Sequence, residues 1–260
     1  MWWTTQADYG IGAYKASVNA FQCMPQKDKD VSEEHKQEQA VLDRLAVYRK
    51  DEVFIYQLAK DLFECRNQAI FPLDFLTYGA IQRSFSTISA IGTLVEQSNM
   101  LAARAILRVH IDTVLRYAAA WFVDNPHEFA SKVHEGKRID QMKDSQGQQL
   151  RDKRLVELLT PDHPWLPTVY ERLSGYIHFS ESHISSVFTN VDEESQRVSF
   201  QFGKHETKYP AESWIEVMDC AHDATGVLAK YIKGWICTKS MKPEEFEALK
   251  KTVKAKATQS

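Results

Sequence analysis

Apolar residues recur at helical spacing over most of the chain, and few residues interrupt them. The 260 residues include only ten glycines and eight prolines. Between Val41 and Phe71 the apolar positions follow the spacing of an amphipathic helix. Pro72 starts a new segment, and further helices are predicted over about residues 73–97, 99–124 and 211–238. The helix over 99–124 is the strongest prediction, because good helix formers run through it without a break.

Strand-like alternation marks one short region. The segment Val198–Phe202 (V-S-F-Q-F) alternates apolar and polar residues and is followed by Gly203. The segment 185–191 is its predicted partner in a small β-hairpin. Earlier in the chain, residues 134–154 are charged and contain glycine, which predicts an exposed loop. A helix is then expected to start near Pro164 and Pro167 and to run to about Phe188.

These patterns predict a mainly α-helical bundle with one small β-hairpin. Residues 1–71 are expected to form an N-terminal helical extension, with a short helix within 1–24, a polar linker, and a second helix start at Ser32. Residues 72–238 form the predicted bundle, and residues 239–260 form a lysine-rich tail with six lysines and three glutamates. Many functions share such a fold, so the fold alone indicates none of them.

Composition and charge exclude few classes of protein. Hydrophobic residues make up 43% and charged residues 26%, which is typical of a folded soluble protein. The net charge of -3 gives no overall field that attracts nucleic acid or membranes. The four cysteines form no Cys-x-x-Cys pair, which favours a reducing compartment. The N-terminus lacks the pattern of a secretory signal, and the longest apolar run, Tyr117–Val123, is too short to cross a bilayer. We therefore expect a cytoplasmic protein with no membrane partner.

A charged stripe lies on the helix predicted over 99–124. Its members recur every four positions: Arg104, Arg108, Asp112 and Arg116. This spacing places them on one face, whereas His110, about 200° from Arg108 around the helix, points elsewhere. A solvated face with ion pairs is one interpretation. The apolar residues around the rest of the helix favour another, in which the stripe borders a polar site inside the bundle.

A second polar stripe lies in Y-E-R-L-S-G-Y-I-H-F-S-E-S-H-I, residues 170–184. Its members also recur every four positions: Tyr170, Ser174, His178 and Ser182. Histidine can transfer a proton near neutral pH, and arginine forms the best fork for a phosphate. Arg172 lies about 120° from His178 around a regular helix, which is poor for joint action. A buried histidine that is satisfied by a neighbouring hydroxyl is the alternative to a reactive one.

Arg172 and His178, with five residues between them, match the Arg-x4–6-His motif, and the segment resembles the HEPN superfamily (higher eukaryotes and prokaryotes nucleotide-binding). The longer pattern Y-E-R-L-S-G-Y-I-H-F-S is similar to the Tyr-x3-Ser-x2-Ile/Val-His-x-Ser signature of uncharacterised bacterial HEPN-like families. Those families also place an arginine-rich helix upstream, as A-R-A-I-L-R-V-H-I-D-T-V-L-R does here. The resemblance covers about residues 76–236. Leu173 departs from it, because active members usually carry a polar residue directly after the arginine.

The resemblance implies an endoribonuclease that needs no metal. The ribose 2′-OH attacks the adjacent phosphate, which only RNA permits. His178 would be the general base or acid, and Arg172 would stabilise charge on the phosphorane. The substrate-binding residues expected beside them are Arg104, Arg108, Asp112, Arg116, Tyr170, Ser174 and Ser182. The same resemblance implies a symmetric homodimer, and a toxin–antitoxin or phage-defence setting with a cognate antitoxin or sensor protein as a further partner.

A non-catalytic HEPN-like module that binds RNA, a nucleotide or a partner protein is the alternative. Leu173 and the acidic net charge favour this module, whereas the arginine stripe together with the Arg–His motif favours the ribonuclease. No cofactor or metal is expected. His178, Glu181 and His183 lack the His-Glu-x-x-His spacing of a zinc site, and no glycine-rich phosphate loop occurs.

Overall fold

The computed structural model describes residues 15–17, 31–180, 183–184, 187–192, 197–200, 202–203, 205–206, 208–242, 244–245 and 248. Within the short helix predicted for 1–24, only Lys15–Ser17 are described, and they form a strand, β1. The rest of that prediction, Ser182 and most of the lysine-rich tail lie outside the described residues.

The described chain is mainly helical with a small β-sheet, as the sequence predicted. The α-helices are α1 (Val31–Tyr48), α2 (Lys50–Glu64), α3 (Pro72–Glu96), α4 (Met100–Ala118), α5 (Pro126–His134), α6 (Asp152–Leu159), α7 (Leu166–Ile177) and α9 (Ala211–Ser240). Short 3-10 helices cover Cys65–Gln68, Ala119–Trp121 and Ile139–Gln141. The strands are β1 (Lys15–Ser17), β2 (Phe188–Asp192) and β3 (Arg197–Phe200).

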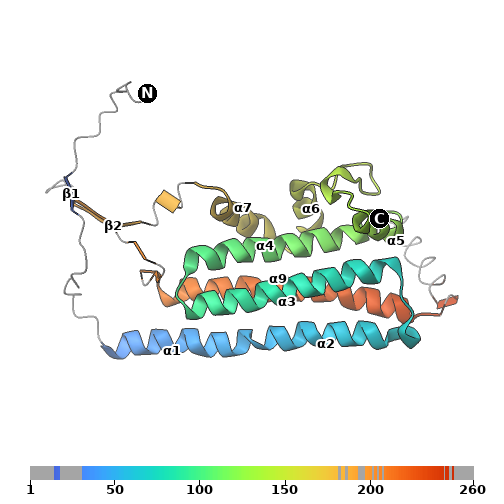
Figure 1. Cartoon of the computed structure of the whole chain (residues 1–260), viewed down its shortest axis with the longest axis horizontal. Coiled ribbons are helices and arrows are strands. Elements are labelled where there is room, and N and C mark those ends of the chain that lie inside the picture. The colour runs from blue at the N-terminus through green and yellow to red at the C-terminus, as the bar shows by residue number, and fades with distance from the viewer. Residues whose placement is uncertain are drawn as a thin grey trace, which may run out of the picture.

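The long helices lie roughly parallel to one axis of the molecule (Figure 1). α1 and α2 follow each other end to end along one side, and they pack against α9 and α3 (Figure 1). α4 packs on α3 and α9 from the other side, and its outer surface is covered by α6 and α7. α4 is therefore the central helix of the bundle.

The predicted hairpin is present. β2 and β3 pair in antiparallel register, with Phe188 opposite Phe200 and Asp192 opposite Arg197. β1 adds in parallel to the other edge of β3, so the sheet order is β1-β3-β2. The sheet lies at one end of the helical bundle (Figure 1).

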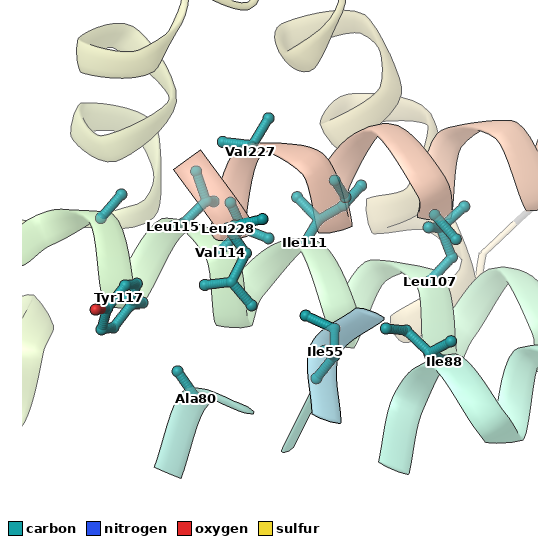
Figure 2. Close-up of a cluster of buried hydrophobic side chains, with 14 of the residues drawn as sticks. Ile55, Ala80, Ile88, Leu107, Ile111, Val114, Leu115, Tyr117, Val227 and Leu228 are labelled. Atoms are coloured by element: carbon teal, nitrogen blue, oxygen red, sulfur yellow. The ribbon is translucent and has the colours of Figure 1, made fainter. Parts of the chain in front are cut away.

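A single apolar core joins α2, α3, α4 and α9. Figure 2 shows Ile55 of α2, Ile88 of α3, Leu107 and Ile111 of α4, and Leu228 of α9 among the side chains that meet there. Each of these side chains is almost completely buried. Full burial of a side chain of this kind contributes about 1.5–3 kcal/mol. The core therefore fixes the position of α4, which presents the charged stripe.

Local signals in the sequence set the starts of the two central helices. The Asn99 side chain accepts a hydrogen bond from the backbone N–H of Ala102 at 3.1 Å, as an N-cap of α4. Pro72 opens α3, and the Asp74 carboxylate accepts from the backbone N–H of Phe71 at 2.7 Å. The predicted helices over 73–97 and 99–124 are confirmed, the second ending as α4 at Ala118 with a 3-10 turn after it.

The loop predicted for 134–154 is less exposed than expected. Leu150 is fully buried, and Asp144 is also buried. The Asp144 carboxylate accepts hydrogen bonds from the backbone N–H groups of Gln146 and Gln148, at 2.9 and 2.8 Å. It also accepts from Arg154 Nε at 2.8 Å. These bonds attach the loop to α6, which begins two residues earlier than the predicted loop ends.

No helix in the described ranges combines the length and the apolar composition that crossing a membrane requires.

Candidate functional site

The charged stripe of α4 lies under α7 and is half-buried. Arg104 Nη1 donates to the Tyr176 hydroxyl at 2.5 Å, and Arg108 Nη2 donates to the Tyr170 hydroxyl. The guanidinium groups also lie over the tyrosine rings, with Arg104 5.1 Å from the Tyr176 centroid and Arg108 3.8 Å from the Tyr170 centroid. The stripe is thus covered by a neighbouring helix and is not a fully solvated face.

Asp152, the first residue of α6, joins the stripe to Tyr170. The Tyr170 hydroxyl donates to Asp152 Oδ2 at 2.5 Å, and Arg116 Nη2 donates to Asp152 Oδ1. Arg108 Nη2 lies 3.4 Å from Asp152 Oδ2. Burial raises the pKa of Tyr170, and its hydrogen bond to Asp152 raises that pKa further. Tyr170 therefore stays protonated near neutral pH and positions Arg108 instead of transferring a proton.

Asp112 joins the stripe to α3. Arg116 Nε donates to Asp112 Oδ1 at 3.3 Å, and Arg83 Nη1 lies 3.4 Å from Asp112 Oδ2. The cluster of Arg83, Arg108 and Arg116 with Asp112 and Asp152 holds three positive and two negative charges, so one positive charge is left over. Arg108 Nε is shielded from solvent and has no hydrogen-bond partner among the described residues. The cluster therefore favours an anion beside it.

A pocket of about 200 Å³ opens beside this cluster, between α3, α4 and the end of α7. We call it the His178 pocket, and it is lined by Arg83, Arg108, Val109, Asp112, Ser174, Ile177 and His178. His178 follows α7 in an extended conformation, is exposed, and donates its backbone N–H to the Ser174 carbonyl at 3.4 Å. An imidazole and two guanidinium groups thus share one small pocket. This combination can hold a phosphate and move a proton.

Arg172 does not line the His178 pocket. Its side chain is 74% exposed, and Nη1 lies 4.0 Å from Glu216 Oε1. It lines a separate depression of about 350 Å³ between α4, α7 and α9, together with Arg104 and Tyr176. The two residues of the Arg–His motif therefore lie on different sides of α7.

The end of α7 corrects the sequence prediction. The helix was expected to continue to about residue 188, but it ends at Ile177. The Ser180 hydroxyl donates to the Gly175 carbonyl at 2.7 Å, so a side chain satisfies a carbonyl of the last turn. His178 is thus no longer a member of a helical stripe, although it still shares a pocket with Ser174 of that stripe. Ser182, the fourth member, lies outside the described residues.

Three residues of this region were not predicted from the sequence: Arg83, Asp152 and Tyr176. Arg83 is the one basic residue of α3, and a single arginine in a mostly apolar helix could have indicated it. Asp152 opens α6, where an acidic side chain is common because it faces the positive end of the helix dipole. Neither signal identifies α4 as the partner, because that contact depends on the tertiary fold.

No family model, curated protein or solved structure matches this chain. In the part of the chain that the structure describes, no three His, Cys, Asp or Glu side chains are grouped so that they could hold a metal ion. The function of the site is therefore inferred from its geometry and from the resemblance of its motif.

Proposed function

We propose that this chain is a HEPN-like protein that binds RNA at the His178 pocket and cleaves it without a metal. The observation that supports this most strongly is the pocket itself, in which His178 lies with the guanidinium groups of Arg83 and Arg108. The overall charge of -3 does not attract RNA, so the local positive excess has to provide the attraction. The resemblance of the Arg–His motif to HEPN ribonucleases implies the same chemistry, although Arg172 itself lines a separate depression.

The proposed reaction is an attack of the ribose 2′-OH on the adjacent phosphorus. His178 removes the proton from the 2′-OH, the new O–P bond forms, and the bond from phosphorus to the 5′-oxygen breaks. The proton held by His178 passes to the 5′-oxygen, so the products are a 2′,3′-cyclic phosphate and a 5′-OH. Arg108 and Arg83 stabilise the extra negative charge on the phosphorane. Tyr170 holds Arg108 in place for this role.

A homodimer completes the proposal. Ile177 lines the His178 pocket and Phe179 directly follows His178 in the chain. Both side chains are apolar and exposed, and Phe179 is 83% exposed. Burial of these side chains between two copies gives a reason for an interface at this end of α7. The resemblance implies that the two Arg–His motifs face each other in such a dimer, which would bring Arg172 of the partner subunit toward the His178 pocket. The resemblance places such nucleases in toxin or phage-defence systems, with an antitoxin or sensor protein as a further partner.

The non-catalytic module remains the second candidate, and two observations favour it. Arg172 and His178 lie on different sides of α7, so a single chain does not present them together. Leu173 is buried in the core and provides no polar group beside Arg172. A protein with this geometry would bind RNA and leave it intact.

RNA and DNA of the same sequence separate the two candidates. We expect the purified protein to cut single-stranded RNA, to leave the DNA intact, and to produce 2′,3′-cyclic phosphate ends. His178→Ala should lower the cleavage rate by about 100-fold or more, because a general base contributes that much, while RNA binding persists. His205→Ala is the matched control, since His205 is an exposed histidine that contacts Gln97 and does not line the pocket.

The outcomes identify the function. RNA binding without cleavage by the wild type establishes the non-catalytic module. Equal cleavage by the wild type and His178→Ala removes His178 from the reaction. An absence of both binding and cleavage of RNA overturns the ribonuclease and leaves, of the second candidate, only a module that binds a nucleotide or a partner protein. In cells, growth arrest with fragmented RNA on expression of the wild type, but not of His178→Ala, places the same reaction in a toxin.

A further inference from the structure

A third depression, of about 350 Å³, lies between α3, α4 and α5, away from the end of α7. Its walls are largely apolar and include Leu76 and Ala80 of α3, Tyr117 of α4, and Val133 of α5. The volume lies within the range of small-molecule sites, which are mostly apolar with a few polar groups that fix orientation. We call it the Gly79 cavity, because Gly79 forms part of its wall.

Gly79 has no packing reason to be glycine. A glycine inside a helix costs about 0.5–1 kcal/mol relative to alanine. Gly92, in the same helix, has such a reason, because a Cβ there would lie 3.1 Å from the Arg49 guanidinium. A Cβ at Gly79 would meet no heavy atom within 4 Å. Its missing side chain leaves the wall of the cavity open, and a larger side chain at this position would enter that space.

The mouth of the cavity carries a positive charge with spare donors. Arg83 lines it and is 46% exposed, and among the described residues its one ion pair is with Asp112, at 3.4 Å. Arg116 also lines the cavity, but its donors already bind Asp112, the Leu150 carbonyl and Asp152. Arg83 is therefore the group that can present a fork of N–H donors to an anion.

An aromatic surface completes the wall. Phe75 is exposed and stacks on the His134 ring, with the centroids 5.7 Å apart and an angle of 27° between the planes. Both rings line the cavity. An exposed aromatic ring beside an apolar wall favours a flat ring as its partner. Three features indicate the kind of ligand that fits: the size of the cavity, its apolar wall and one available guanidinium.

We propose that the Gly79 cavity binds a small planar aromatic carboxylate. Its ring lies against the apolar wall beside Phe75, and its carboxylate accepts hydrogen bonds from Arg83. The site does not depend on RNA binding or cleavage, since its ligand can be measured with no RNA present. Arg83 also lines the His178 pocket, so a bound carboxylate would act on a residue that the two sites share.

The probes are 2-naphthoate and its neutral analogue 2-naphthamide, with binding to the full chain followed by calorimetry. We expect the wild type to bind 2-naphthoate more tightly than 2-naphthamide. Gly79→Leu should weaken 2-naphthoate binding by at least about tenfold, because the leucine occupies the cavity while favouring the helix. Gly226→Leu is the matched control. Gly226 is also an exposed glycine within a helix, and a Cβ added to it would meet no heavy atom within 4 Å. It lines none of the three pockets described above.

Arg83→Gln tests the carboxylate independently of the shape of the cavity. The Arg83 side chain is half-exposed. Its substitution should lower the affinity for 2-naphthoate to the affinity for 2-naphthamide. The proposal is overturned if the wild type binds both probes equally. It is also overturned if Gly79→Leu and Arg83→Gln bind 2-naphthoate as tightly as the wild type does. A wild type that binds neither probe overturns it as well.

Discussion

His110 shows how a single residue on the helix that carries the charged stripe can belong entirely to the core. The sequence places it away from the arginine stripe, and in the structure it is completely buried. Its ring nitrogens are hydrogen-bonded to Thr87 Oγ1 at 2.9 Å and to Thr225 Oγ1 at 3.0 Å. The two threonines connect α3 and α9 to α4 through one imidazole. A satisfied core histidine explains this residue fully, so it needs no role in catalysis.

His110 should make the stability of the fold depend on pH. Burial lowers its pKa in the folded chain to about 4, below the value of 6.5 expected for an unfolded chain. The unfolded state therefore takes up a proton as the pH falls below 6.5, whereas the folded state does not. The free energy of unfolding decreases by about 1.4 kcal/mol per pH unit in this window, and by roughly 3 kcal/mol in all by pH 4.

Urea unfolding of the wild type and His110→Gln isolates this effect from the acidic residues, which titrate in both proteins. The difference in free energy of unfolding between the wild type and the variant should shrink by roughly 2 kcal/mol between about pH 7 and about pH 5. A difference that stays the same at both pH values would show that His110 is not a buried neutral group.

At the scale of elements, periodicity predicted the long helices and missed where α7 ends. α3 and α4 agree with their predicted ranges, because apolar spacing and the capping residues Pro72 and Asn99 act locally. The same kind of pattern continues past Ile177, but Ser180 bonds to the last turn and the chain becomes extended at His178. The contact between Arg83 and the stripe could not be predicted, since no local pattern places α3 beside the polar face of α4.

The C-terminal end of α9 is fixed by a buried ion pair. Lys239 Nζ donates to Asp74 Oδ2 at 3.0 Å, and the two side chains are 2% and 1% exposed. Asp74 also accepts hydrogen bonds from Trp235 Nε1 and from the backbone N–H of Phe71, both at 2.7 Å. This network connects the last turns of α9 to the start of α3. The predicted boundary between the bundle and the lysine-rich tail, at residue 239, thus falls on a core residue of the described chain.

Lys239→Met should destabilise the fold by about 3–5 kcal/mol, because it leaves the Asp74 carboxylate buried without a counter-charge. Lys230→Met is the matched control in the same helix. It removes an exposed pair with Asp162, which should cost less than about 1 kcal/mol. Adding Asp74→Asn to Lys239→Met should recover part of the loss. Urea unfolding of the wild type, the two single lysine variants and the double variant measures these changes. An equal loss of unfolding free energy in the two single lysine variants would contradict a charged Asp74 in the core.

At the scale of the whole molecule, α1 and α2 pack as part of the bundle. α2 contacts α3 and α9, and α1 contacts α9. His222 of α9 binds the buried Asp51 carboxylate of α2, with Nδ1 2.9 Å from Oδ2. Ile55 is fully buried in the same core as α4 (Figure 2). Residues 31–64 therefore share one core with the helices that line the His178 pocket. This shared core predicts how the protein unfolds.

We expect one cooperative unfolding transition that includes α1 and α2. No tryptophan lies between residues 31 and 71, so tryptophan fluorescence reports only on the rest of the molecule, whereas far-UV circular dichroism reports on all helices. Ile55→Ala removes a core side chain and should cost about 2–5 kcal/mol. If the core is shared, this substitution in α2 lowers the urea midpoint seen by fluorescence as much as the midpoint seen by circular dichroism.

Val53→Ala is the control in the same helix, because Val53 is exposed and its loss should change stability by less than about 0.5 kcal/mol. A fluorescence midpoint that stays at the wild-type value in Ile55→Ala, while circular dichroism shows two steps, would establish residues 31–71 as a unit that unfolds independently of the rest of the bundle. Coincident shifts in both signals would mean that α1 and α2 unfold together with α4, to which they are joined through α3 and α9. Any truncation meant to isolate the His178 pocket then has to keep them.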